Sequence, residues 1–207
     1  MIEKAILNFP KQFDFNPVVK WVQALPWAPR IIAASTSIGE LPGQFRFEPG
    51  IERRDQLEKR YGFIVSGMGG SHLAADLLKS VCYKDVLLVL HQDYCLPPMR
   101  EDDLQNCLFI ASSYSGNTEE VLDGLEEARK KGMTTAAIAM GGRLEEIARE
   151  YNIPFIKLPD THIQPRSALG FSVLALMQLM GLEQELESIH GLSRTLDAEQ
   201  LEPQGKK

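Results

Sequence analysis

The segment Ser66–Ser71 (S-G-M-G-G-S) combines glycines and serines in a way that suits the binding of an anion. It lies between a short apolar run and a stretch with helical periodicity. Glycines let the backbone approach an anion closely, and the start of a helix presents N–H groups without partners and a favourable dipole. Ser71 is suited to cap the helix or to donate its hydroxyl to a phosphate oxygen. Taken alone, the segment is explained more simply as a tight turn that ends in a serine cap.

A second segment, Ser112–Glu119 (S-S-Y-S-G-N-T-E), also follows an apolar run and precedes a helical pattern. Its small hydroxyl residues are Ser112, Ser113, Ser115 and Thr118. Helix capping accounts for one of these hydroxyls but not for the whole set. We therefore expect a loop that surrounds a phosphate with hydroxyl groups and backbone amides.

The spacing of these segments departs from two common nucleotide-binding motifs, which disfavours nucleotide hydrolysis and leaves a dinucleotide fold only a distant alternative. Neither segment carries the lysine of the P-loop, and the glycines of the first fall as G-x-G-G rather than G-x-G-x-x-G. The histidines show no spacing typical of metal ligands; they are His72, His91, His162 and His190. We expect neither a metal nor a cofactor.

Short apolar runs alternate with amphipathic stretches from residue 62 to residue 180, which is typical of an α/β fold. The expected strands are residues 63–66, 86–90, 108–111, 135–139 and 154–158. The run 86–90 is apolar throughout, as in a strand covered on both faces. The pattern predicts a three-layer, flavodoxin-like sandwich with a five-stranded parallel sheet and helices on both faces. The two hydroxyl-rich segments then follow neighbouring strands and face one crevice, where open α/β sheets bind ligands.

The two ends of the chain are less regular than its centre. We expect a helical or irregular extension that packs on the core over residues 1–60, the α/β domain over 61–183, and a polar helix and tail over 184–207. Residues 16–25 have the spacing of a helix, whereas prolines interrupt residues 26–60, whose role the sequence leaves open.

Composition narrows the class of protein. The chain has 207 residues, a hydrophobic fraction of 44% and a net charge of −6, so one α/β core is expected and nucleic acid is an unfavoured partner. No apolar stretch approaches the roughly 20 residues of a membrane span, and the N-terminus lacks a secretion signal. The three cysteines form no C-x-x-C pair and are expected to be reduced. These features predict a cytoplasmic protein without a membrane partner.

Three motifs resemble a known family. The segment S-S-Y-S-G-N-T-E-E is similar to the S-x-S-G-x-T signature of sugar isomerase (SIS) domains, and G-M-G-G-S resembles their first phosphate-side loop. Together with Gln164–Gly170 (Q-P-R-S-A-L-G), they resemble the N-terminal domain of bifunctional phosphoglucose/phosphomannose isomerases, in the same order, over residues 62–180.

The resemblance implies a role for each matching position. The residues implied to bind the substrate phosphate are Gly69, Gly70, Ser71, Ser113, Tyr114, Ser115 and Thr118. Arg166 matches the arginine that reaches the reacting end of the sugar. The implied reaction converts glucose 6-phosphate or mannose 6-phosphate to fructose 6-phosphate, with a base that moves a proton between C1 and C2 and with Arg166 stabilising the enediolate.

The general base is not identified. Family members carry two SIS domains, and their base glutamate, together with a histidine and a lysine for ring opening, lies in the second one, to which this chain has no matching residues. The titratable candidates near the expected pocket are Glu119, Glu120 and His72. Both glutamates are explained more simply as favourable charges in a first helical turn. His72 stands where the family usually has glycine, and either a sugar contact or a solvent-facing ring is compatible with the sequence.

Three functions therefore remain in view. The first is an isomerase domain that acts with a second SIS domain or subunit. The second is a non-catalytic sensor of sugar phosphates, and the third is a self-contained homodimeric isomerase similar to the single-domain phosphoheptose isomerases. In each of them the partner is a sugar phosphate, and the expected assembly is a homodimer or a pair of SIS domains.

Overall fold

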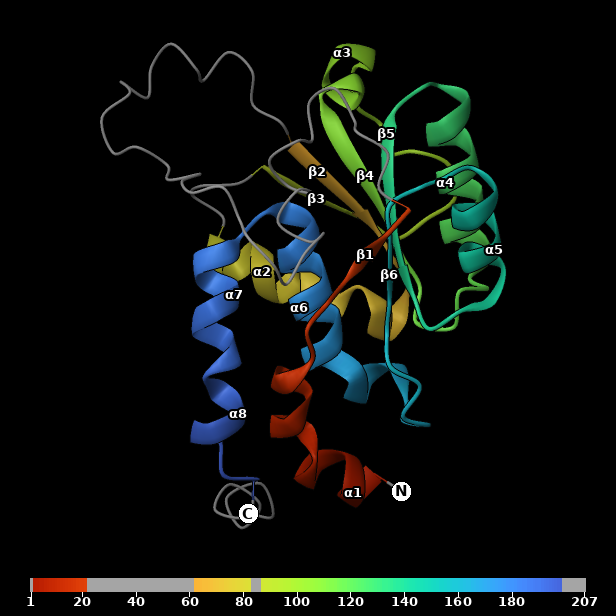
Figure 1. Ribbon diagram of the computed structural model, residues 1–207. Coiled ribbons are helices and arrows are strands. Elements are labelled where there is room, and N and C mark those ends of the chain that lie inside the picture. The colour runs from red at the N-terminus through yellow and green to blue at the C-terminus, as the bar shows by residue number, and fades with distance from the viewer. Residues whose placement is uncertain (1, 22–61, 83–86, 199–207) are drawn as a thin grey trace, which may run out of the picture.

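The computed structural model describes residues 2–21, 62–82 and 87–198. Within them a six-stranded sheet has the order β1-β6-β5-β4-β2-β3 (Figure 1). Its strands are β1 (Val19–Lys20), β2 (Gly62–Ser66), β3 (Leu88–His91), β4 (Cys107–Ser112), β5 (Thr134–Ala139) and β6 (Phe155–Lys157). All pairings are parallel except that of β1 with β6. The predicted parallel α/β sheet is confirmed, with one antiparallel strand added at its edge.

Helices cover both faces of the sheet. The α-helices are α1 (Ile2–Leu7), α2 (Leu73–Cys82), α3 (Glu101–Gln105), α4 (Glu119–Lys130), α5 (Gly142–Glu150), α6 (Leu169–Met180), α7 (Glu183–His190) and α8 (Leu192–Thr195). The described residues also form short 3₁₀ helices, namely η1 (Phe9–Asp14), η4 (Gly69–Ser71) and η5 (Pro165–Ala168). Helices α2 and α6 lie on one face, and α4 and α5 lie on the other (Figure 1). This is the three-layer arrangement predicted from the sequence.

The alternation of side chains along each strand builds two cores. In β4, Leu108 and Ile110 join the cluster under α2 and α6, whereas Phe109 and Ala111 join the cluster under α4 and α5. Successive side chains of a strand point to opposite faces, so a central strand that is apolar throughout must be covered twice. The sheet is thereby fixed between its helix layers, and the loops at its carboxyl edge have a rigid base.

The helix predicted for residues 16–25 is wrong in its described part. Val19 and Lys20 pair with Ile156 and Phe155 as an edge strand, and Val19 is buried while Val18 is exposed. An exposed residue followed by a buried one is the pattern of a strand, and pairing with β6 outweighs the helical spacing of the valines. Residues 22–25 and the segment 26–60 lie outside the described residues.

Strand β3 also differs from the prediction. The apolar run was expected to be covered on both faces, but β3 is an edge strand in which only Leu88 is buried. Leu87, just before it, is 48% exposed. Helix α3 was not predicted, because five residues are too few to show a periodic pattern. Among the described residues, no helix has the length and apolar character needed to cross a membrane.

Truncation of a buried ring should test the doubly covered sheet. Phe109 on β4 is fully buried, so Phe109→Ala is expected to lower the free energy of unfolding by about 3–5 kcal/mol, measured by urea denaturation. Leu87→Ala, at a half-exposed position, is the control and should cost less than about 1 kcal/mol. Equal losses for the two variants would contradict the packing described here.

Candidate phosphate-binding site

The two hydroxyl-rich loops meet at the carboxyl edge of the sheet. The first loop (Gly67–Ser71) follows β2, and the second loop (Ser113–Thr118) follows its neighbour β4. The Tyr114 N–H donates a hydrogen bond to Ser71 Oγ at 2.9 Å. The Ser112 hydroxyl donates to the Ser71 carbonyl oxygen at 3.1 Å. Ser71 therefore joins the two loops.

Within the second loop, the hydroxyl groups divide into two kinds. Ser113 is 1% exposed, and its Oγ accepts a hydrogen bond from the Gly116 N–H at 3.0 Å and pairs with Thr118 Oγ1 at 2.8 Å. Ser115 is exposed and Thr118 is partly exposed. Ser113 is thus used to shape the loop. Ser115 Oγ accepts a hydrogen bond from the Asn117 N–H at 3.3 Å, and the side chains of Ser115 and Thr118 are more exposed than that of Ser113.

Helix α4 begins directly at this loop. Thr118 is its N-cap residue but makes no side-chain hydrogen bond to the first turn. The N–H groups at the start of a helix lack intrahelical partners and carry a partial positive charge. The end of the second loop thus combines backbone donors, a helix dipole and two hydroxyls, which is a set suited to a phosphate.

Glycine is required at the centre of the second loop. Gly116 has a φ of +74°, and a Cβ at this position would lie 1.8 Å from the carbonyl oxygen of Gly141. The Gly116 carbonyl oxygen in turn accepts a hydrogen bond from Leu144 N–H at 2.9 Å. The loop is therefore held against the β5–α5 connection by contacts that leave no room for a side chain.

The third motif packs directly on the first loop. A Cβ on Gly70 would lie 2.7 Å from the backbone nitrogen of Arg166 and 2.9 Å from the carbonyl carbon of Pro165. The third segment (Gln164–Gly170) thereby reaches the same edge of the sheet as the first loop. Arg166 itself is exposed. The structure thus brings together the three motifs that the sequence singled out.

Tyr114 occupies the second loop only with its backbone. Its side chain is 6% exposed and joins the core cluster under α6, and this burial raises the pKa of its phenol. Besides the bond to Ser71, the Tyr114 carbonyl oxygen accepts a hydrogen bond from Met140 N–H at 2.9 Å. The ring anchors the loop in the core, and the backbone N–H and carbonyl of Tyr114 are both used to hold the loop in place.

The three candidate bases lie at the starts of two helices. His72 precedes α2, its side chain is 16% exposed, and its Nδ1 lies 2.5 Å from a carboxylate oxygen of Asp76. The ring is therefore paired along the helix rather than free in solvent. Glu119 and Glu120 occupy the first turn of α4, where Glu120, with a smaller contribution from Glu119, raises the pKa of Tyr94.

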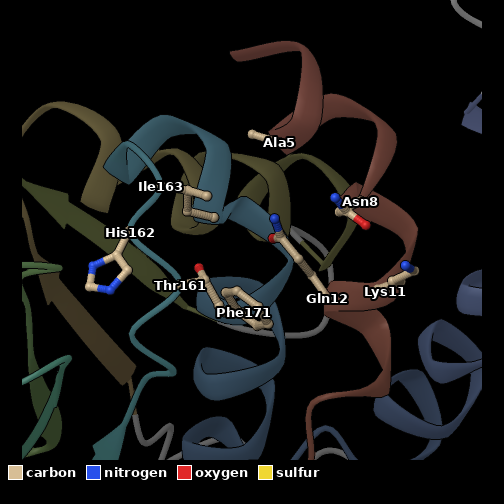
Figure 2. A pocket seen from close by; sticks show the side chains of 8 residues that line it. All are labelled: Ala5, Asn8, Lys11, Gln12, Thr161, His162, Ile163 and Phe171. Atoms are coloured by element: carbon tan, nitrogen blue, oxygen red, sulfur yellow. The ribbon is translucent and has the colours of Figure 1, made fainter. Parts of the chain in front are cut away.

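A hollow of about 540 Å³ lies on the other side of the third segment (Figure 2). It is lined by Ala5, Asn8, Lys11, Gln12, Thr161, His162, Ile163 and Phe171. These residues come from the N-terminal segment, the loop after β6 and the start of α6, and they form no motif in the sequence. Within the described residues, no group of three or more His, Cys, Asp or Glu side chains is arranged to hold a metal ion.

Comparison with known proteins gives related sequences but no matching family model. The chain is 37% identical to a bifunctional phosphoglucose/phosphomannose isomerase of Caldicellulosiruptor bescii over 118 residues, which are 56% of this chain and 34% of the relative. It is 36% identical to the corresponding protein of Thermoplasma acidophilum over 136 residues, covering 65% of this chain and 41% of the relative. The alignments thus span only between a third and two fifths of these relatives.

A shorter match and a solved structure extend this comparison. A D-glucosamine-6-phosphate 4-epimerase of Sulfolobus acidocaldarius is 35% identical over 95 residues, which are 45% of this chain and 29% of the relative. A structure from Silicibacter pomeroyi DSS-3, assigned to the phosphosugar isomerases, has a TM-score of 0.55 at 13% identity and covers 95% of this chain and 55% of its own. At this identity the structural match supports the fold.

Gly116→Ala tests the close contact in the second loop. Because the new Cβ would overlap the Gly141 carbonyl, the variant should lose about 3 kcal/mol or more of unfolding free energy, measured by urea denaturation. Gly132→Ala is a matched control, since Gly132 has a similar φ of +71° but no atom within 4 Å of the added Cβ. It should cost only about 1–2 kcal/mol. Equal costs would show that backbone strain, rather than the contact with Gly141, makes glycine necessary.

Proposed function

The chain contains a SIS-like phosphosugar isomerase domain homologous to part of the bifunctional phosphoglucose/phosphomannose isomerases, and we propose that it binds the phosphate of a hexose 6-phosphate in an aldose–ketose isomerase. One observation carries the proposal: Ser71 of the first loop bonds to Ser112 and Tyr114, and so joins that loop to the hydroxyl-rich loop that leads into α4. The proposed substrates are glucose 6-phosphate or mannose 6-phosphate, with fructose 6-phosphate as the product.

Phosphate binding follows from the donors of the second loop. The hydroxyls of Ser115 and Thr118 and the first N–H groups of α4 would donate hydrogen bonds to the phosphate oxygens. Ser113, Ser71 and Tyr114 would hold these donors in place through the bonds described above. The net charge of −6 is compatible with this mode, because local dipoles can bind an anion without a basic surface.

The reacting end of the sugar is assigned to Arg166. A guanidinium near C1 and C2 would stabilise the negative charge of the enediolate that forms when a base removes the proton. The contact of Gly70 with the backbone of Arg166 supports this role, because it holds the third segment beside the phosphate loops.

The base is proposed to come from a second SIS domain or a second subunit. Support comes from α2, whose apolar side chains at positions 73, 77 and 81 are spaced by one helical turn and are 36%, 45% and 69% exposed. Such a line of exposed apolar side chains on a helix is typical of an interface. A homodimer or a pair of SIS domains would cover it. We propose a cytoplasmic location. The proposal includes no membrane, nucleic acid or cofactor.

A non-catalytic sensor of sugar phosphates is the second candidate. It is favoured by the position of Glu119 and Glu120 in the first turn of α4. A helix dipole stabilises carboxylates in this turn, so the presence of these two residues does not require a catalytic role. A sensor needs the phosphate-binding loops and a response to the sugar, but no base.

The phosphate site is tested by removing the hydroxyls of Ser115, which is exposed, and Thr118, which is partly exposed. Ser115→Ala combined with Thr118→Val keeps the shape of the side chains, so the protein should remain folded. Its affinity for fructose 6-phosphate, measured by calorimetry, should fall by about tenfold or more, because each lost bond to a charged group contributes about 1.5–3 kcal/mol. Ser188→Ala on α7 is the control for a serine outside the site. Unchanged affinity of the double variant would refute the assignment of the second loop.

The two candidate functions are separated by turnover. A coupled assay of the purified chain with glucose 6-phosphate and with mannose 6-phosphate should show no isomerisation when the chain is alone, although fructose 6-phosphate binds. Addition of a base-bearing second SIS domain should restore turnover of an isomerase but not of a sensor. Turnover by the chain alone would instead indicate a self-contained homodimer, and His72, Glu119 and Glu120 would then be replaced in turn to find the base.

A further inference from the structure

Gln12 is a buried polar residue in the N-terminal segment, far in sequence from the three motifs. Its side chain is only 3% exposed. Its Nε2 donates a hydrogen bond to the carbonyl oxygen of Ser167 at 2.5 Å, and its Oε1 accepts one from the N–H of Gly170 at 2.9 Å. In Figure 2 the side chain extends from the N-terminal segment toward the start of α6. One amide group thus binds the backbone on both sides of the junction between η5 and α6.

The bond from the Gly170 N–H satisfies a donor that helix α6 cannot satisfy itself. Helix α6 has Ala168 at its N-cap, which offers no side-chain acceptor to the first turn. Gly170 is buried, so water cannot easily take the place of such an acceptor. A Cβ on Gly170 would lie 2.8 Å from Cβ of Gln12, which shows how closely the two segments fit. Gln12 therefore supplies a helix cap from a segment more than 150 residues earlier in the chain.

The same short segment is fixed on its other side by the first loop. The backbone of Arg166 lies so close to Gly70 that a side chain at position 70 would not fit. Gln12 binds the next residue, Ser167. The backbone of Arg166 is thus confined between the loop that contributes to the phosphate site and an amide that comes from the N-terminal segment.

From this arrangement we propose that Gln12 is a positioning residue, which sets where the Arg166 guanidinium meets the reacting end of the sugar. The inference rests on the proposed function, and it adds the N-terminal segment to the parts that complete the site. Gln12 is proposed to act mainly on the sugar end, since its bonds go to the third segment and none reaches the second loop. Loss of its bonds should therefore reduce recognition of the carbonyl and hydroxyl groups near C1 and C2 but leave phosphate binding intact.

A double-mutant cycle tests this role with the full chain. The affinities for fructose 6-phosphate and for glycerol 3-phosphate, which has the phosphate but lacks the C1–C2 end of the hexose, are measured by calorimetry. The variants are Gln12→Met, Arg166→Met, their combination and Gln178→Met, the last being a control on α6 remote from Arg166. Gln12→Met should weaken fructose 6-phosphate by about tenfold and glycerol 3-phosphate by less than about twofold. In the Arg166→Met background the same substitution should have no further effect.

Each of the following results would overturn the inference. An equal loss for both ligands, or a Gln12→Met effect that persists without the Arg166 guanidinium, would mean that Gln12 acts only on general stability. If the wild type binds fructose 6-phosphate and Arg166→Met binds it equally well, the proposed roles of Arg166 and Gln12 are refuted, but the phosphate site is not. If the wild type binds neither ligand, the proposed function fails as well.

Gln12→Glu keeps the inference testable if the methionine variant does not fold. A protonated carboxyl group can donate to the Ser167 carbonyl and accept from Gly170, as the amide does, whereas a carboxylate cannot donate. Burial favours the neutral form and raises the carboxyl pKa above its value in the unfolded chain. The affinity of this variant for fructose 6-phosphate, relative to the wild type at the same pH, should therefore be near one at about pH 5 and fall toward about pH 8. A ratio that does not change with pH would contradict the two-bond role of Gln12.

Discussion

The hydrogen bond from the Tyr114 N–H to Ser71 Oγ is the contact on which the arrangement of the site depends. It connects the loops that follow β2 and β4, which are neighbouring strands of one rigid sheet. The ring of Tyr114 is buried in the core on one side, and Gly116 is pressed against Gly141 on the other. The second loop can therefore keep its shape without a ligand, and this limits the entropy that binding a phosphate would cost.

Because of this constraint, residues of the same type have different roles in the site. Buried hydroxyls such as that of Ser113 are consumed in shaping the loop, and the exposed hydroxyl of Ser115 remains for a ligand. The glycines likewise differ, since Gly70 allows backbone contact with Arg166 while Gly116 allows contact with Gly141. Because the donors are backbone amides, hydroxyls and a helix dipole, an acidic chain can present a site for an anion.

Regular features were predictable because they repeat. The apolar runs that became β2, β4 and β5 and the helical spacing of α4 and α6 are local patterns, and the loops between them carry residue types with a clear chemical use. Other features depend on contacts distant in sequence. A two-residue strand such as β1 gains its stability from pairing with β6. A lone glutamine such as Gln12, between Lys11 and Phe13, gives no sign of a partner 155 residues away. The pairing of His72 with Asp76 was accessible from their i, i+4 spacing.

The central claim is that the amides and hydroxyls of the second loop hold the phosphate of a sugar. The most direct measurement is a titration of the ¹⁵N-labelled chain with fructose 6-phosphate, followed by the backbone amide resonances. The account predicts that the largest shifts belong to residues 115–118 and the first turn of α4, with smaller ones in the first loop, and that inorganic phosphate shifts the same amides. Shifts confined to the hollow beside Lys11 and His162, or no saturable shifts at millimolar ligand, would contradict it.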